Sequence, residues 1–185
     1  MKYPFIIALF LLEIIFLKFP VRAQSKIDFS KFANYSDVSI QVWTTEKGLP
    51  SNDIYDIVKG ENGFYYLGTS NGFVRFDGTE FKVYNTKNTE QIKANVTRNI
   101  FMDRQGKIWM GNGGVGILIY NGNKFDRITE EQGLSLNYPS CFEEDADGRI
   151  YIGTRGDGLN IYDRGKFSVI KKEDGLTSNY INTIL

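Results

Sequence analysis

Few residues of this chain are of types that carry out chemistry, because its 185 residues include no histidine. Nucleophile pairs that need histidine, histidine metal sites and a phosphorylated histidine are therefore excluded. The single cysteine, Cys141, cannot form an internal disulfide or a cysteine-rich zinc site, and we expect a small buried side chain there. The 22 basic and 22 acidic residues balance, so there is no electrostatic basis for binding nucleic acid. Any chemistry must come from carboxylates, hydroxyls, aromatic rings or the backbone.

Two short motifs are similar to ligand-binding loops. Residues 145–148 (DADG) match the start of a calcium loop but lack the third spaced ligand and the later glutamate. Residues 111–116 (GNGGVG) suggest a phosphate loop, yet no Lys-Ser/Thr pair and no helix follow them. The sequence therefore predicts a turn between strands at each place, and neither a metal nor a cofactor is expected.

Aromatic rings and asparagines recur at equivalent places and have the chemistry to stack on a sugar or to line a channel. They are Tyr66, Trp109 and Tyr151, and Asn52, Asn95, Asn137 and Asn179. Because each set occupies one position of a repeat, we expect the rings to lie in the core between repeats. We expect the asparagines to bond neighbouring backbone and fix a turn. No catalytic, ligand-binding or metal-binding residue is assigned from the sequence.

The elements that must position these residues form a repeat. The four asparagines are separated by 43, 42 and 42 residues. Gly63, Gly106 and Gly148 each open a run centred on an aromatic residue, namely FYYLGT, KIWMGN and RIYIGT. Agreement at many positions in the same order identifies a repeat architecture.

Each unit has the pattern of four short strands. In the third unit the expected strands are residues 137–144, 149–154, 159–163 and 166–171. In the second of these, Ile150 and Ile152 point to one side and Tyr151 to the other. Four strands every ~40–45 residues predict an all-β propeller, with blades at about 52–86, 95–129 and 137–172.

The ends of the array predict an incomplete ring. Residues 40–48 match 167–175, so an orphan outer strand is expected at 40–44. Residues 179–185 match the start of a further blade. Four blades, the smallest usual propeller, would need ~170 residues of this repeat, more than follow residue 23. We therefore predict a partial propeller over 40–185 that begins a longer protein.

The N-terminus is typical of a secretory signal peptide. Lys2 precedes an apolar run over 5–17, and residues 21–23 (VRA) have the small-residue pattern of a cleavage site. The apolar run is short for a transmembrane helix, which needs ~20 residues, although an uncleaved anchor is the alternative. We predict a signal peptide over 1–23, followed by a lead segment over 24–39.

The strings GLPSNDIYDI, DRQGKIWMGNGGVG and DADGRIYIGTRGDGLNIYD resemble the two-component regulator propeller repeat. The resemblance extends over all of the expected exported chain except its short lead. The tryptophan of the family pattern is Trp109 in the second unit but Tyr66 and Tyr151 in the others. The valine of the first strand is replaced by Thr97 and Pro139. These departures predict looser packing around the replaced positions.

This resemblance implies a periplasmic sensor region of a hybrid two-component histidine kinase, as found in Bacteroidota. The parent protein would be dimeric, anchored in the inner membrane and linked to cytoplasmic signalling domains. The completed propeller would bind a small extracellular ligand such as an oligosaccharide, and this chain itself would not be an enzyme. Two alternatives stay open: the N-terminal part of a secreted propeller hydrolase or lyase, and a protein-binding scaffold.

Overall fold

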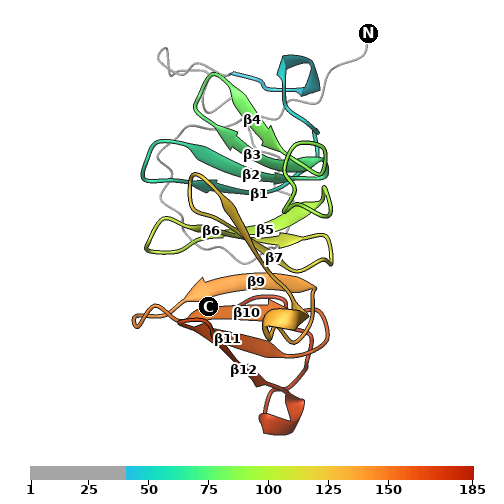
Figure 1. Cartoon of the computed structure of the whole chain (residues 1–185), viewed down its shortest axis with the longest axis vertical. Coiled ribbons are helices and arrows are strands. Elements are labelled where there is room, and N and C mark those ends of the chain that lie inside the picture. Colours follow the sequence, from blue (N-terminus) through green and yellow to red (C-terminus); the bar gives the residue numbers. More distant parts are fainter. Residues whose placement is uncertain (1–40) are drawn as a thin grey trace, which may run out of the picture.

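Short runs of alternating side chains, separated by glycine-rich turns, form twelve strands in the part of the chain that the structure describes (Figure 1). This structure is a computed structural model that describes residues 41–185, so the predicted signal peptide and lead segment lie outside it. The strands form three four-stranded antiparallel sheets arranged as an open array. The predicted all-β fold of four-stranded blades is confirmed.

Each blade is a meander in which the order of strands across the sheet follows the chain. Blade 1 contains β1 (Ile54–Lys59), β2 (Tyr65–Thr69), β3 (Gly72–Phe76) and β4 (Phe81–Tyr84). Blade 2 contains β5 (Thr97–Met102), β6 (Ile108–Asn112), β7 (Ile117–Tyr120) and β8 (Phe125–Ile128). Blade 3 contains β9 (Pro139–Glu144), β10 (Ile150–Thr154), β11 (Leu159–Asp163) and β12 (Lys166–Ile170). Short 3-10 helices, η2 (Thr45–Lys47), η3 (Glu130–Gln132) and η4 (Lys172–Asp174), lie in connections between outer and first strands.

Alternate side chains along a strand point to the two faces of the sheet and pack against the two neighbouring blades. The first strands lie next to one another, β1 beside β5 and β5 beside β9. In β6, Ile108 and Met110 are buried in the core shared with blade 1, whereas Trp109 between them is buried in the core shared with blade 3. The sheet of blade 2 is therefore buried on both faces, which is why β6 is apolar at successive positions.

The predicted orphan outer strand at 40–44 is not formed as a strand in the described residues. Ile40 lies outside them, and within 41–44 only Val42 has a β-bridge. A strand needs a hydrogen-bonded neighbour along its length, and the described residues provide none here. The segment still contacts blade 1, because the Trp43 ring lies 5.0 Å from Phe76 and 5.3 Å from Phe81 between centroids. Likewise, 179–185 contain a single bridge, from Tyr180 to Arg155.

Three of the four residues that depart from the family pattern are buried. Tyr66 and Trp109 have the same exposed fraction, 3%. Thr97 and Pro139 are also buried, although the Thr97 hydroxyl has no hydrogen-bond partner among the described residues. Tyr151, on the face of blade 3 opposite blade 2, is half-buried. The replacements at Tyr66, Thr97 and Pro139 therefore keep these positions buried, and looser packing around them stays a prediction.

Candidate functional site

The four recurring asparagines hold the connections between blades. Each side-chain oxygen accepts a hydrogen bond from a backbone N–H earlier in the chain. The pairs are Thr45 with Asn52 (3.2 Å), Thr86 with Asn95 (3.0 Å), Glu130 with Asn137 (3.0 Å) and Lys172 with Asn179 (2.7 Å). Three of these N–H groups belong to the first residue of a 3-10 helix, and each of these helices ends at a glycine with positive φ. The asparagines therefore fix turns, as predicted.

The equivalent aromatic rings fix the hairpin turn that precedes them in each blade. The bonded pairs are Trp109 Nε1 with Asp103 Oδ2 (2.8 Å), Tyr151 Oη with Asp145 Oδ2 (3.1 Å), and Tyr66 Oη with Asn62 Nδ2 (2.9 Å). In blade 1, Gly60 occupies the place of the aspartate, and the partner comes from Asn62 instead. Tyr66 and Trp109 lie in the cores between blades, so their polar atoms orient the turn and their rings fill the core.

The two motifs that are similar to ligand loops are hairpin turns, as predicted. Residues 145–148 join β9 to β10, and 111–116 span the connection from β6 to β7. Asp145 accepts bonds from the backbone N–H groups of Asp147 (2.9 Å) and Arg149 (3.0 Å) and from the Arg149 guanidinium (2.6 Å). Although desolvation acts in the opposite direction, these bonds lower the pKa of Asp145 to about 2. Within residues 41–185, no group of three or more histidine, cysteine or acidic side chains is placed to hold a metal.

Cys141 is half-buried in β9, beside Gly153 of the neighbouring strand. Desolvation raises the pKa of its thiol. A reactive cysteine requires a lowered pKa, because the thiolate is the nucleophile. The position is therefore that of a small packing residue, although it is half-buried and not buried as expected from the sequence.

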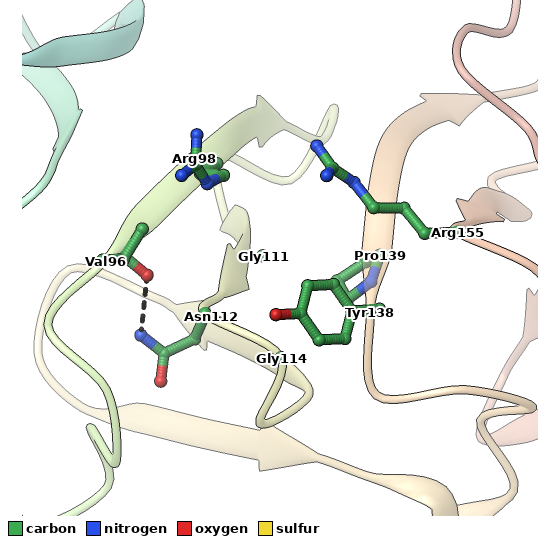
Figure 2. Close-up of a pocket in the computed structure, with 9 residues that line it drawn as sticks. Val96, Arg98, Gly111, Asn112, Gly114, Tyr138, Pro139 and Arg155 are labelled. Atoms are coloured by element: carbon green, nitrogen blue, oxygen red, sulfur yellow. Dashed lines mark hydrogen bonds between the residues drawn. The ribbon is translucent and has the colours of Figure 1, made fainter.

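A cleft of about 140 Å³ lies between blades 2 and 3 (Figure 2). We call this end of the blades, where the loops β2–β3, β6–β7 and β10–β11 meet the starts of the first strands, the mouth. Arg98 of β5 and Arg155 of the β10–β11 loop extend from opposite sides of the cleft, and the Tyr138 ring lies below both of them in this view. Gly113 and Gly114 of the β6–β7 loop line the same cleft. Three separate parts of two blades thus converge on it.

Arg98 stands at a β-bulge, since the pairing of β5 with β6 shifts between Thr97 and Ile100. Equivalent irregularities occur near the starts of β1 and β9. A bulge bends the strand and changes the direction of a side chain. In β1 the bulge lies at Tyr55, and the Arg98 guanidinium carbon is 4.5 Å from the centroid of its ring. This cation–π contact restricts the position of the Arg98 side chain at the mouth.

Tyr138 rests on a glycine. A Cβ at Gly114 would overlap the Tyr138 ring, and Gly114 also has φ 83°, a conformation that favours glycine. The ring is therefore packed on one face while the residue as a whole is 49% exposed. Asn112 holds the loop in place, because its side chain accepts from the Ala94 N–H (3.3 Å) and donates to the Ala94 carbonyl (2.5 Å).

The cleft has positive charge that no acidic residue of its lining balances. Arg98 and Arg155 are exposed, and neither forms a salt bridge with another of residues 41–185. Asp157, in the same loop as Arg155, is already paired with Lys171 at 2.6 Å, and that pairing raises the pKa of Lys171. Two guanidinium groups, an exposed phenol ring and a glycine loop together can bind a polar ligand with a flat apolar face.

The sequence alone does not single out these cleft residues, because they converge only across two blades. The repeat nevertheless shows that the positions of both arginines carry different residues in the other blades. Where blade 2 has Arg98, the other blades have Tyr55 and Ser140, and where blade 3 has Arg155, they have Ser70 and Gly113. Positions that support the blade agree between repeats, whereas these two mouth positions differ from blade to blade.

Comparison with known proteins gives a family match and similar folds. Residues 48–71 and 133–156 match the family described as two component regulator propeller. The extracellular domain of BT3049, assigned to a hybrid two-component system of B. thetaiotaomicron, is 25% identical, with a TM-score of 0.69 over 77% of this chain. The extracellular domain of BT4673, assigned to a hybrid two-component system of the same organism, is 21% identical, with a TM-score of 0.60 over 78% of this chain.

These solved structures are much longer than this chain, which covers 22% of BT3049 and 20% of BT4673. A streptogramin B lyase is 19% identical, with a TM-score of 0.52 over 65% of this chain and 41% of its own, a similarity of fold alone. No protein with a curated description matches this chain in sequence. Among residues 41–185, no helix has the length and apolar character needed to cross a membrane.

Proposed function

We propose, from the premise that this chain carries two-component regulator propeller repeats, that it supplies part of the ligand-sensing propeller of a membrane-bound two-component regulator. The observation that carries the proposal is the family match at 48–71 and 133–156, together with the 25% identity to an extracellular domain assigned to such a system. A periplasmic location belongs to the same proposal and is supported by the signal-peptide pattern over 1–23.

The cleft at the mouth is the part of this chain that we assign to ligand binding. Its lining combines charged, aromatic and glycine residues from both blades that border it, a mixture typical of small-molecule sites. An exposed tyrosine ring such as Tyr138 can stack on a sugar, which supports an oligosaccharide as the ligand. The role is binding, and the chemistry of signalling would belong to a kinase elsewhere in the whole protein.

The proposal is tested by sequencing the reading frame beyond Leu185. We expect further propeller repeats, a transmembrane segment and a histidine kinase with its phosphorylated histidine. The whole protein, in membrane vesicles, should then change its rate of autophosphorylation when oligosaccharides are added on the propeller side. A frame that ends in a secreted protein with paired carboxylates at the channel would contradict the proposal and favour a hydrolase or lyase.

Export is tested separately with a fusion to alkaline phosphatase, which is active only after it crosses the inner membrane. The fusion joined after residue 185 should be active, and its matched control without residues 1–23 should be inactive. Equal activity of the two fusions would contradict the periplasmic assignment.

A further inference from the structure

We propose that the cleft binds an oxyanion, a carboxylate or sulfate group on a small ligand, between Arg98 and Arg155. This inference rests on the proposed function and specifies the chemistry of the ligand at the same site. The apolar face of the ligand would lie on the exposed Tyr138 ring, which lines the same cleft below the two guanidinium groups in Figure 2.

The first argument is charge. The chain as a whole has equal numbers of acidic and basic residues, yet the lining of the cleft includes two arginines and no acid. The acid in the Arg155 loop, Asp157, is held by Lys171 through a bond of 2.6 Å. Neither guanidinium group has a carboxylate partner among residues 41–185, and an oxyanion that accepts charge-assisted hydrogen bonds from them would supply the missing negative charge.

The second argument is that the blade does not need these arginines. Neither guanidinium makes a hydrogen bond to another described residue, whereas Arg127 of β8 donates from its guanidinium to the Val115 carbonyl (2.7 and 3.1 Å). Elsewhere in the repeat, tyrosine, serine and glycine occupy the positions of Arg98 and Arg155. Apart from the contact of Arg98 with the Tyr55 ring, the two guanidinium groups have no partner among residues 41–185, so their hydrogen-bond donors are available for a ligand.

The third argument is preorganisation, because a site held in place binds with a smaller loss of entropy. Arg98 extends from a bulge and lies over the Tyr55 ring at 4.5 Å. The backbone of Arg155 is fixed by a bond from its N–H to the Tyr138 carbonyl (3.0 Å) and by its bridge to Tyr180. Tyr138 is supported from below by Gly114. The Arg155 backbone and the Tyr138 residue are thus held together, and the Arg98 side chain is held separately by Tyr55 of β1.

The test is an NMR titration of the isotope-labelled full chain with four probes: glucuronic acid, glucose 6-sulfate, glucose and sodium sulfate. We expect both acidic sugars to shift the amide signals of Gly113 and Gly114 and the Nε signals of the two arginines. Glucose should bind at least about tenfold more weakly, since it lacks charge-assisted hydrogen bonds. Sodium sulfate alone should shift the arginine signals and leave the Tyr138 ring signals in place. A preference for glucuronic acid or for glucose 6-sulfate identifies the carboxylate or the sulfate as the natural group.

Charge-removing variants make the test specific. Arg98→Gln and Arg155→Gln should each weaken binding of the acidic sugars about tenfold. The matched control is Arg164→Gln, at an exposed arginine in the turn between β11 and β12, which should leave binding unchanged. Raising the salt from about 0.05 to about 0.5 M should weaken binding of the acidic sugars and leave that of glucose unchanged.

Two results overturn the inference, and they differ in what they say of the proposed function. If glucose shifts the same amides with equal affinity, the cleft is a sugar site without charge selection, and the sensing function stands. If no probe shifts the cleft signals, the oxyanion site is rejected. The sensing function is then decided by the reading frame beyond Leu185, which is an independent result.

Discussion

The two interfaces between neighbouring blades use the same repeat positions but fill them with different side chains. Between blades 1 and 2 the core is aromatic, and its rings are Tyr66, Phe73, Tyr84, Tyr120 and Phe125. Between blades 2 and 3 the core is built mainly from isoleucines around Trp109 and Phe142. Both cores are closely packed, so the backbone of the blade is compatible with either set. Core composition therefore says little about what each interface does.

The loops of the mouth differ more between the two interfaces than the cores do. Above the first, loop side chains bond to one another, as in the Ser51–Ser70 pair (2.6 Å) and the Asn95–Asn71 pair (3.3 Å). Above the second, the β6–β7 loop consists of Gly113 and Gly114 followed by valine, so the space that side chains would fill is open. The two interfaces thus differ more in their polar loop residues than in their ability to form a core, and the following changes test what each part contributes.

The largest effect is expected at Trp109, in the second interface. Trp109→Ala should lower the free energy of unfolding by about 3–5 kcal/mol, because a buried ring is lost. Trp109→Phe keeps a buried ring and removes the indole N–H. Among the described residues, Oδ2 of the buried Asp103 accepts a hydrogen bond from Trp109 alone, so this variant should lower the free energy of unfolding by about 1–3 kcal/mol. The matched change in the first interface, Tyr66→Phe, should cost less, because its partner Asn62 is exposed. Denaturant unfolding measures all three. Equal costs of Trp109→Phe and Tyr66→Phe would contradict this role of the indole N–H.

The next effect is expected at Gly114 in the mouth. Gly114→Ala should lower the free energy of unfolding by about 2 kcal/mol, because the new methyl group overlaps the Tyr138 ring and φ is positive. The control is Gly122→Ala, where φ is 92° and no atom lies within 4 Å of the added carbon; it isolates the backbone cost of about 1 kcal/mol. Thermal unfolding of both variants measures the loss of stability, and titration with the acidic sugars measures the effect on binding. Binding that survives Gly114→Ala unchanged would show that Tyr138 is not part of the site.

A stabilising change is expected at Thr97, under the first interface. Its hydroxyl is buried without a partner among the described residues. Thr97→Val should raise the free energy of unfolding by about 1 kcal/mol, since an unsatisfied polar atom is replaced by a methyl group of similar size. Thr97→Ser keeps the hydroxyl and removes the methyl group, so it should be destabilising. A loss of stability in the valine variant would indicate a bound water at this hydroxyl.

The smallest effect is expected at the Tyr84–Tyr120 pair, whose hydroxyls are 3.0 Å apart. Desolvation, followed by the bond to Tyr84, raises the pKa of Tyr120 to about 12. The unfolded chain then loses this proton at lower pH than the folded chain, so stability falls as pH rises from about 10, the ordinary pKa of tyrosine, to about 12. Tyr84→Phe should lower the pKa of Tyr120 and reduce that fall, at a cost near neutral pH of about 1 kcal/mol or less. Absorbance titration of tyrosinate checks it, with Tyr55→Phe as the control that leaves the transition near 12 in place.

Much of the fold follows from the repeat, because each strand carries its own alternation and each turn its own glycine. The sheets, the turn at 145–148 and the bonding role of the asparagines agree with the sequence-based predictions, and the predicted resemblance is confirmed by the family match. The 3-10 helices are not predicted, because three residues are too few to show a period, although the glycine after each one is visible in the sequence. The cleft is not predicted either, since Arg98 and Arg155 meet only through a bulge and a loop of different blades.

The asparagine bonds have a consequence for how such a chain evolves. Asn52, Asn137 and Asn179 each bond to an N–H seven residues earlier, so these three connections are complete within one short stretch of sequence. A gene duplication that begins and ends at this stretch copies a blade together with the means of joining it to the next. Copies can then diverge at the mouth while the joints stay intact, and Arg98 and Arg155 are differences of this kind between the three blades.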